Sequence, residues 1–264
     1  MRFLKKYYGI FMYLKRNKHY LLSAALIGSA ILSVPVAQAS TSFTSSALLT
    51  YTINSITNLN PEHPADLSGL EVLGFFDQGS DLTNYYVANT GDGEVTANNP
   101  GIFPTAVTHS FSQVFSVSAS ALNGTVDSRH TGLYNLAFTN TGSDTYAIDL
   151  TLGYQLNANA AGLNAVNNVA LDYFTLNSGY SDYAAVGAFT LAGRLSDTQS
   201  VSGFFTPINF TVNSNDIELV SADVLITGTL EASPVPVPAA VWFFVSGLLG
   251  VLGLNKRRTG LRLM

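Results

Sequence analysis

Cysteine is absent from the 264 residues of this sequence, and basic residues are scarce in its long middle part. Without cysteine, disulfide bonds, thiol catalysis and cysteine-ligated metal sites are all excluded. Between residues 40 and 231, Arg129 and Arg194 are the two basic side chains against seventeen acidic ones, a formal charge of −15. Binding to nucleic acid needs clustered lysine and arginine. We therefore expect no nucleic-acid partner; calcium, cationic polymers or neutral glycans fit this charge better.

The short motifs of common enzyme classes are also missing. The sequence has no HExxH metal pair, no G-x-S-x-G elbow, no phosphate loop and no dinucleotide fingerprint. His63, His109 and His130 stand singly rather than at the spacing of paired metal ligands. We expect a protein that is not an enzyme. A secreted hydrolase with an unrecognised site is one alternative, since two of the many carboxylates could form a glycosidase pair.

A period of two dominates the middle of the chain. Apolar residues alternate with polar ones over residues 146–156, and a similar alternation precedes a turn-forming stretch at residues 140–144. This pattern is typical of strands with one buried face, and it predicts a β-hairpin over residues 133–157. Helical periodicity is absent from residues 40–231. We therefore expect an all-β fold, an antiparallel β-sandwich that is jelly-roll-like or immunoglobulin-like.

Other strands follow from the same signal, with irregularities at three places. In the strand expected at residues 111–121, Gln113 and Val114 break the alternation, which predicts a bulge. Residues 89–104 lack periodicity and predict a long loop, and residues 158–169 suit a short helix or a loop. The further expected strands are 48–56, 71–76, 84–88, 169–176, 185–191, 208–212 and 222–230.

The first 39 residues have the pattern of a secretory signal peptide. A basic beginning is followed by an apolar stretch over residues 21–36 and by the small-residue site Ala37-Gln38-Ala39. We expect cleavage after Ala39, because the small-residue site argues against the alternative of an uncleaved N-terminal anchor. The protein would then be exported, and the mature domain would comprise residues 40–231.

The last residues predict a membrane-retained tail. Residues 232–238 form a proline linker, and no residue from Pro238 to Leu254 is charged. A helix over residues 239–255 is nearly long enough to cross a bilayer at about 1.5 Å per residue. The basic residues Lys256, Arg257 and Arg258 would stop transfer and keep residues 256–264 in the cytoplasm. Because this helix has no polar face, a buried core helix fits less well.

The tail resembles that of a known family. The motif Val235-Pro236-Val237-Pro238-Ala239, the following apolar helix and the basic stop resemble the PEP-CTERM sorting tail, in the variant Val-Pro-Leu-Pro-Ala. Val237 departs from the leucine or glutamate usual at that position. The resemblance covers residues 234–258. It implies recognition by an exosortase, a membrane-embedded transpeptidase of Gram-negative bacteria, and passage from the inner membrane to the cell surface or exopolysaccharide.

Two groups of residues are candidates for a binding site. Arg129 lies in the mixed-charge stretch Asp127-Ser128-Arg129-His130 and suits a ligand carboxylate, or else an ion pair with a neighbouring acid. Oxygen ligands gather around glycines in two acidic stretches, which suits either calcium or tight turns. The candidate calcium ligands are Asp77, Asp81, Asp92 and Glu94. Tyr85, Tyr86, Tyr180 and Tyr183 are candidates for stacking on sugar rings.

These observations together predict an exported surface or extracellular-matrix protein. Its role would be structural or adhesive in the envelope, exopolysaccharide or biofilm, and its partners an exosortase-like enzyme, the inner membrane and a glycan. A carbohydrate-binding module, with or without calcium, is the second interpretation.

Overall fold

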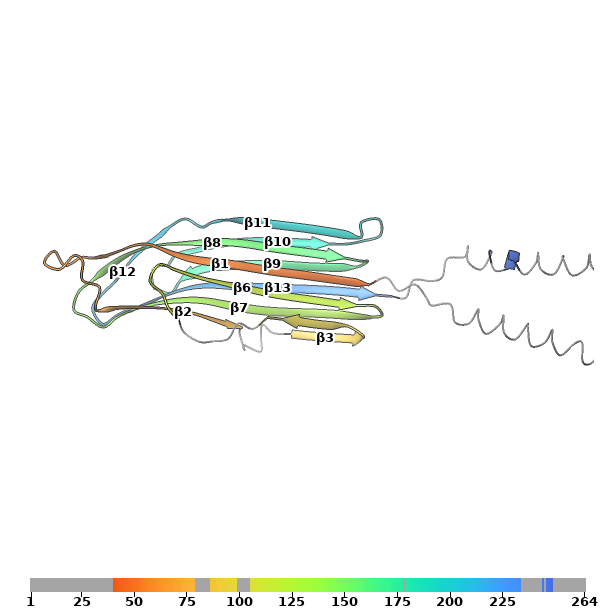
Figure 1. Cartoon of the computed structure of the whole chain (residues 1–264), viewed down its shortest axis with the longest axis horizontal. Coiled ribbons are helices and arrows are strands. Elements are labelled where there is room, and N and C mark those ends of the chain that lie inside the picture. The colour runs from red at the N-terminus through yellow and green to blue at the C-terminus, as the bar shows by residue number, and fades with distance from the viewer. Residues whose placement is uncertain are drawn as a thin grey trace, which may run out of the picture. The chain divides into compact units, whose positions relative to one another are not determined.

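The strands of this domain run along one axis, as Figure 1 shows. The computed structural model describes residues 40–78, 86–98, 105–177 and 179–233, with residue 244 and residues 246–248. All strands in this part of the chain lie within one unit, Gln38–Pro234. They are β1 (Thr41–Asn58), β2 (Leu70–Gln78), β3 (Tyr86–Gly91), β4 (Glu94–Ala97), β5 (Thr105–Ala106), β6 (Ser110–Ala121), β7 (Gly124–Asn140), β8 (Tyr146–Ala161), β9 (Ala165–Thr175), β10 (Ser181–Phe189), β11 (Ser196–Phe204), β12 (Ile208–Val212) and β13 (Ile217–Ala232).

The strands form two antiparallel sheets, so the all-β, antiparallel prediction is confirmed. The first sheet has the order β11-β8-β1-β6-β4, with β12 also paired to β8. The second sheet has the order β10-β9-β13-β7-β2-β5, with β3 also paired to β7. Every strand pair in both sheets is antiparallel.

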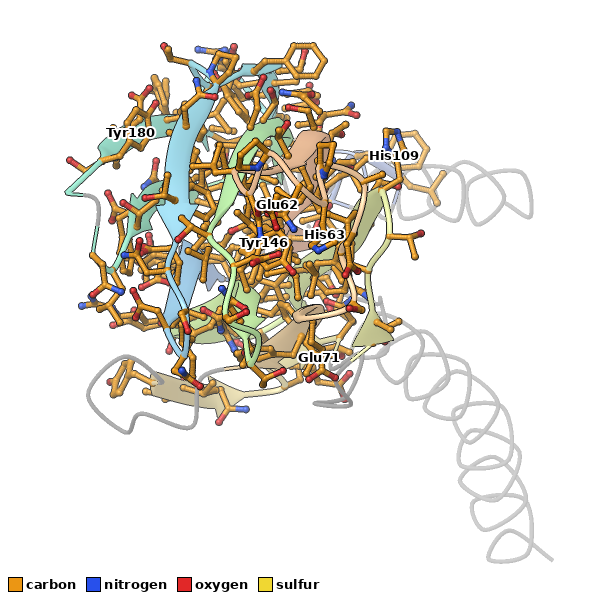
Figure 2. All side chains as sticks on the ribbon, turned by 90° about the vertical axis from the view of Figure 1, so that its left-hand side faces the viewer. Glu62, His63, Glu71, His109, Tyr146 and Tyr180 are labelled. Atoms are coloured by element: carbon orange, nitrogen blue, oxygen red, sulfur yellow. The ribbon has the colours of Figure 1, made fainter. Side chains whose placement is uncertain are left out.

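One hydrophobic core is shared by the two sheets. Alternate residues of the long strands point into it, for example Phe43, Ala47 and Tyr51 from β1, and Leu136 and Phe138 from β7. Figure 2 looks along the strands; Tyr146, which is 2% exposed, lies near the middle, and His109 and Tyr180 lie at opposite sides. The alternation in the sequence is therefore the direct cause of the core, since successive side chains of a strand point to opposite faces.

The predicted hairpin over residues 133–157 is wrong. Both strands exist, but β7 belongs to the second sheet and β8 to the first. The short connection between them turns a corner from sheet to sheet, and the two apolar faces then look toward each other across the core. Alternation gives each strand a buried face, but it does not decide whether the strands pair side by side or face each other.

Three smaller expectations also need correction. β6 pairs with β1 without a register shift at Gln113, and the shift lies instead in the β1–β8 pair, between Ile53 and Ser55. The expected loop over residues 89–104 contains the end of β3 and all of β4. The expected helix or loop over residues 158–169 is the end of β8 and the beginning of β9, and β11 was not predicted.

Candidate functional site

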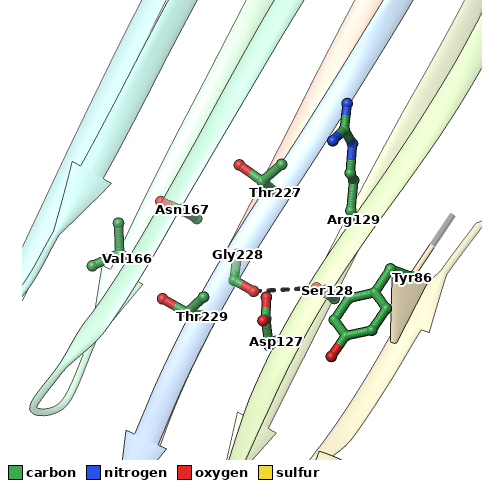
Figure 3. A pocket seen from close by; sticks show the side chains of 9 residues that line it. All are labelled: Tyr86, Asp127, Ser128, Arg129, Val166, Asn167, Thr227, Gly228 and Thr229. Atoms are coloured by element: carbon green, nitrogen blue, oxygen red, sulfur yellow. Dashed lines mark hydrogen bonds between the residues drawn. The ribbon is translucent and has the colours of Figure 1, made fainter. Parts of the chain in front are cut away.

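Arg129 lies in a shallow hollow on the outer face of the second sheet. β7 turns its odd-numbered residues outward here, and the register places Arg129 between Tyr86 of β3 and Thr227 of β13. The hollow measures about 380 Å³ and is shown in Figure 3. Its lining consists of Tyr86, Asp127, Ser128, Arg129, Val166, Asn167, Thr227, Gly228 and Thr229.

The chemistry of this hollow is mixed. The Ser128 hydroxyl donates to the carbonyl oxygen of Gly228 at 3.4 Å, so it supports the sheet (Figure 3). Within the described residues Arg129 makes no ion pair within 4.0 Å, and its side chain is exposed. Asp127, which shares its outward face, weakens the attraction of the guanidinium for an anion. The arrangement suits a ligand with hydroxyl groups and an apolar face at least as well as a carboxylate.

The other basic residue of the domain is already engaged. Arg194 pairs with Asp197 and lies over the Phe189 ring, with 5.1 Å from Cζ to the ring centroid. The backbone N–H of Phe189 donates to Asp197 Oδ2 at 3.1 Å, and the Gln199 amide donates to Oδ1 at 2.8 Å. The Phe189 hydrogen bond, helped by Gln199 and Arg194, lowers the pKa of Asp197. This cluster therefore links β10 of the second sheet to β11 of the first.

The candidate calcium ligands do not meet in the described part of the chain. The side chain of Asp77 and all of Asp81 lie outside it. Asp92 Oδ1 accepts the backbone N–H groups of Leu122 and Asn123 at 3.0 and 2.8 Å, which fixes the turn between β6 and β7. Glu94 is exposed on β4. Among the described side chains no group of three His, Asp or Glu residues is placed to hold a metal ion. Asp92 thus has a role in a turn, and calcium binding stays a prediction.

His130, beside Arg129, is turned into the core. Its side chain is 1% exposed, and burial lowers the pKa of its imidazole below the usual 6.5. The unfolded chain therefore binds more protons than the folded chain once the pH falls below about 6.5. The contribution of His130 to the free energy of unfolding is therefore fully present above that pH and decreases below it.

A leucine at position 130 is expected to flatten this pH dependence. The contribution of His130 to the slope of unfolding free energy cannot exceed about 1.4 kcal/mol per pH unit, the limit for one proton. Urea unfolding at pH 7.5, 6.5 and 5.5 would measure it, with the exposed His109→Leu as the matched control. If His130→Leu and the parent protein lose stability equally between pH 6.5 and 5.5, the burial of a neutral imidazole is not the cause.

The outer face of the first sheet is a further candidate surface, which the sequence did not indicate. Its outward residues are mostly serine, threonine, asparagine and glutamine, and Phe204 stands among them with 80% of its surface exposed. A hollow of about 570 Å³ beside Phe204 is lined by Leu48, Thr50, Gly153, Tyr154, Gln155, Ser202, Gly203 and Phe204. The sequence contains Phe204 and Phe205 in succession, and nothing in it tells which of the two points outward.

The tyrosines proposed for sugar stacking are divided. Tyr86 and Tyr183 are 50% and 59% exposed on the second sheet, whereas Tyr180 packs edge-on against Tyr173 with 5.5 Å between ring centroids. Tyr85 lies outside the described residues. Exposed aromatic rings are therefore available on both sheets.

The residues of the two ends lie outside the described part of the chain. This holds for Ala37 and Ala39, for the motif Val235, Pro236, Val237, Pro238 and Ala239, and for Lys256, Arg257 and Arg258. Residue 244 and residues 246–248 are helical. Among the described residues, no helix has the length and apolar character needed to span a bilayer.

Comparison with known proteins adds little. No protein family and no curated protein matches the sequence. Among solved structures, the translocator domain of the autotransporter NalP from Neisseria meningitidis aligns at 8% identity with a TM-score of 0.11. The alignment covers 81% of this chain and 96% of that one. A TM-score this low carries no argument about fold or function.

Proposed function

We propose that this chain is an exported surface or extracellular-matrix protein with a structural or adhesive, non-enzymatic role. The observation that carries the proposal is the outer face of the first sheet, which is uncharged between Asp149 and Glu94 at its two ends. There, hydroxyl and amide side chains from β6, β1, β8 and β11 stand in rows over adjacent strands. A broad face of this kind suits association with an extended partner, while most small-molecule sites are enclosed.

The two-sheet architecture supports the finer fold assignment as part of the same proposal. Two antiparallel sheets over one core are what a β-sandwich requires, and a jelly-roll-like or immunoglobulin-like sandwich remains our proposal for it. Such a domain needs no disulfide in the periplasm, because its core is large and continuous.

Sorting through the tail is the part of this function that can be tested most directly. The signal peptide would deliver the chain to the inner membrane, and an exosortase-like enzyme would process it near Pro236 and Pro238. The support is the resemblance of residues 234–258 to a PEP-CTERM tail. The acidic domain would then be released to the cell surface, exopolysaccharide or biofilm.

Replacing Pro236 and Pro238 together by alanine is expected to abolish processing. The full-length protein should accumulate in the inner membrane of a Gram-negative host that carries an exosortase, because the rigid extended motif read by the enzyme is lost. Immunoblots of membrane, surface and medium fractions would measure this.

The matched control replaces Pro61 and Pro64, two exposed prolines between β1 and β2, by alanine. This double variant should be processed as the parent protein is. Unchanged processing of the Pro236 and Pro238 variant would reject the sorting assignment.

A carbohydrate-binding role is the second candidate, and a specific observation favours it. Phe204 exposes an aromatic ring beside hydroxyl groups on the same face. Aromatic rings with one apolar face and polar neighbours are suited to ligands that are themselves half apolar and half polar.

A further inference from the structure

We propose that the outer face of the first sheet binds a neutral polysaccharide, with Phe204 as the stacking platform. This inference rests on the proposed function, because it names the partner that the adhesive face would hold. The binding surface is the hollow beside Phe204 together with the rows of hydroxyl and amide groups that continue from it over β1 and β8.

The Phe204 ring is held over the sheet by a glycine. Phe204 of β11 pairs directly with Gly153 of β8. A Cβ atom at position 153 would come within 3.0 Å of Phe204 Cε1 and 3.2 Å of Cδ1. The ring therefore covers the position where a side chain would stand, an arrangement known from aromatic residues that cover glycines in sheets. One side of the ring rests on the strand, and most of its surface, 80% for the residue, remains open to solvent.

Hydrogen-bonding groups lie in register with this ring on the neighbouring strands. The register places Ser112, Thr50, Gly153 and Phe204 in one row across four strands. Thr50 Oγ1 and Ser112 Oγ are 3.0 Å apart, so each hydroxyl orients the other. Groups oriented before binding lose less conformational freedom when a ligand arrives.

Two further rows repeat this pattern along the strands. The Asn157 amide donates to Ser46 Oγ at 3.2 Å, and the Thr198 hydroxyl donates to Asn159 Oδ1 at 2.9 Å. The Ser46–Asn157 row lies four residues from the Thr50 row, and the row between them holds Gln155 and Ser202. The Asn159–Thr198 row lies two residues beyond the Ser46–Asn157 row, so successive rows are about 7 Å apart. The face thus offers polar groups at a regular interval, which suits a polymer of repeating units better than a single small molecule.

The charge of this face and of the whole domain favours a neutral polymer over an anionic one. Asp149 and Glu94 lie at the two ends of this face, and the outward positions between them are uncharged. An anionic polymer would find no cation here and would be repelled by a domain of formal charge −15. A neutral polysaccharide meets no such repulsion, and its sugar rings present CH groups to an aromatic face and hydroxyls to the serine and threonine rows.

A second copy of the chain is a poorer occupant. Two such faces packed together would bury rows of hydroxyls around Phe204, Leu48 and Val114, whereas stable protein interfaces have a broad apolar centre.

Affinity electrophoresis tests the proposal on the full-length protein in mild detergent. The gels contain hydroxyethylcellulose or xyloglucan as neutral polymers, or alginate as an anionic one. We expect retardation by at least one neutral polymer and none by alginate. Phe204→Ala should weaken the binding at least tenfold, and Phe204→Trp should keep it.

Tyr86→Ala tests the competing site, because it removes an exposed aromatic residue from the Arg129 hollow on the other sheet. It should change the affinity by less than twofold. Thermal unfolding of Phe204→Ala should match the parent protein, since the side chain is mostly in solvent. Retention of affinity in Phe204→Ala, loss of affinity in Tyr86→Ala, or preference for alginate would each overturn the assignment.

Absence of retardation in both neutral polymers would also overturn it. Dimerisation that disappears in Phe204→Ala without any glycan binding would show that the face holds a second copy instead. If the tail is processed correctly but one of these two results is obtained, the binding face is rejected and the proposed sorting function is not.

Discussion

Replacing Phe115 by alanine is expected to reduce the free energy of unfolding by about 3–5 kcal/mol, as for other large aromatic residues removed from a core. Phe115 is fully buried on β6, and its ring centroid lies 5.8 Å from that of Phe76 across the core. A Cβ atom built on Gly132 would stand 2.8 Å from Phe115 Cδ1, so the ring fills the space that this glycine leaves. Urea unfolding monitored by circular dichroism would measure the loss.

Val114→Ala provides the matched control on the same strand. Val114 is 44% exposed, so its truncation should change the unfolding free energy by no more than about 0.5 kcal/mol. A bulge at Gln113 and Val114 would turn Val114 toward the core and make the two variants similar. Comparable losses in both would therefore contradict the unbroken β1–β6 register.

Asn140→Ala is expected to cost about 2–4 kcal/mol, because it leaves several buried polar groups without partners at about 1–3 kcal/mol each. Asn140 is 1% exposed at the corner between β7 and β8. Its amide group donates to the carbonyl oxygens of Asp144, Asn213 and Val212 at 2.6, 2.9 and 3.2 Å. Its Oδ1 accepts the backbone N–H of Gly142 at 2.9 Å.

Two further variants separate these contacts. Asn140→Asp keeps the acceptor for Gly142 but places a carboxylate against three carbonyl oxygens, so it should be no more stable than Asn140→Ala. Thr141→Ala, at the exposed next position, should change stability by no more than about 0.5 kcal/mol. Urea midpoints of the three variants would decide the matter. A stable Asn140→Asp would show that the amide donors are not what fixes this corner.

The positions of most strands could be predicted from the sequence, but their pairing partners could not. β12 was expected at residues 208–212 and lies there, because alternation and flanking turn residues are local signals. The link between β7 and β8 was also expected as a turn. The turn leads into the other sheet because Asn140 hydrogen-bonds to Val212 and Asn213. These residues lie 72 and 73 positions further along the chain. The local alternation of residues cannot predict such long-range contacts.

Of the candidate site residues, the sequence indicated Arg129 but not Phe204. Arg129 attracted notice because cations are rare in the sequence, and it does line a hollow. Phe204 had no such signal, since a phenylalanine in an apolar pair is read as core. Its outward direction follows from the register between β11 and β8, and its ring position from a glycine on the neighbouring strand. Asp92 resembled a metal ligand by composition, but turns use the same residue types.

The placement of β1 and β13 constrains how the domain is made. β13 ends at Ala232 and lies between β7 and β9, while β1 begins at Thr41 and lies between β8 and β6. If the chain crosses a membrane with its N-terminus first, as the proposed export requires, the middle strand of one sheet is missing until almost all of the domain has emerged. The second sheet could then form only after β13 had emerged. Until that point the domain would stay unfolded and accessible to chaperones and proteases.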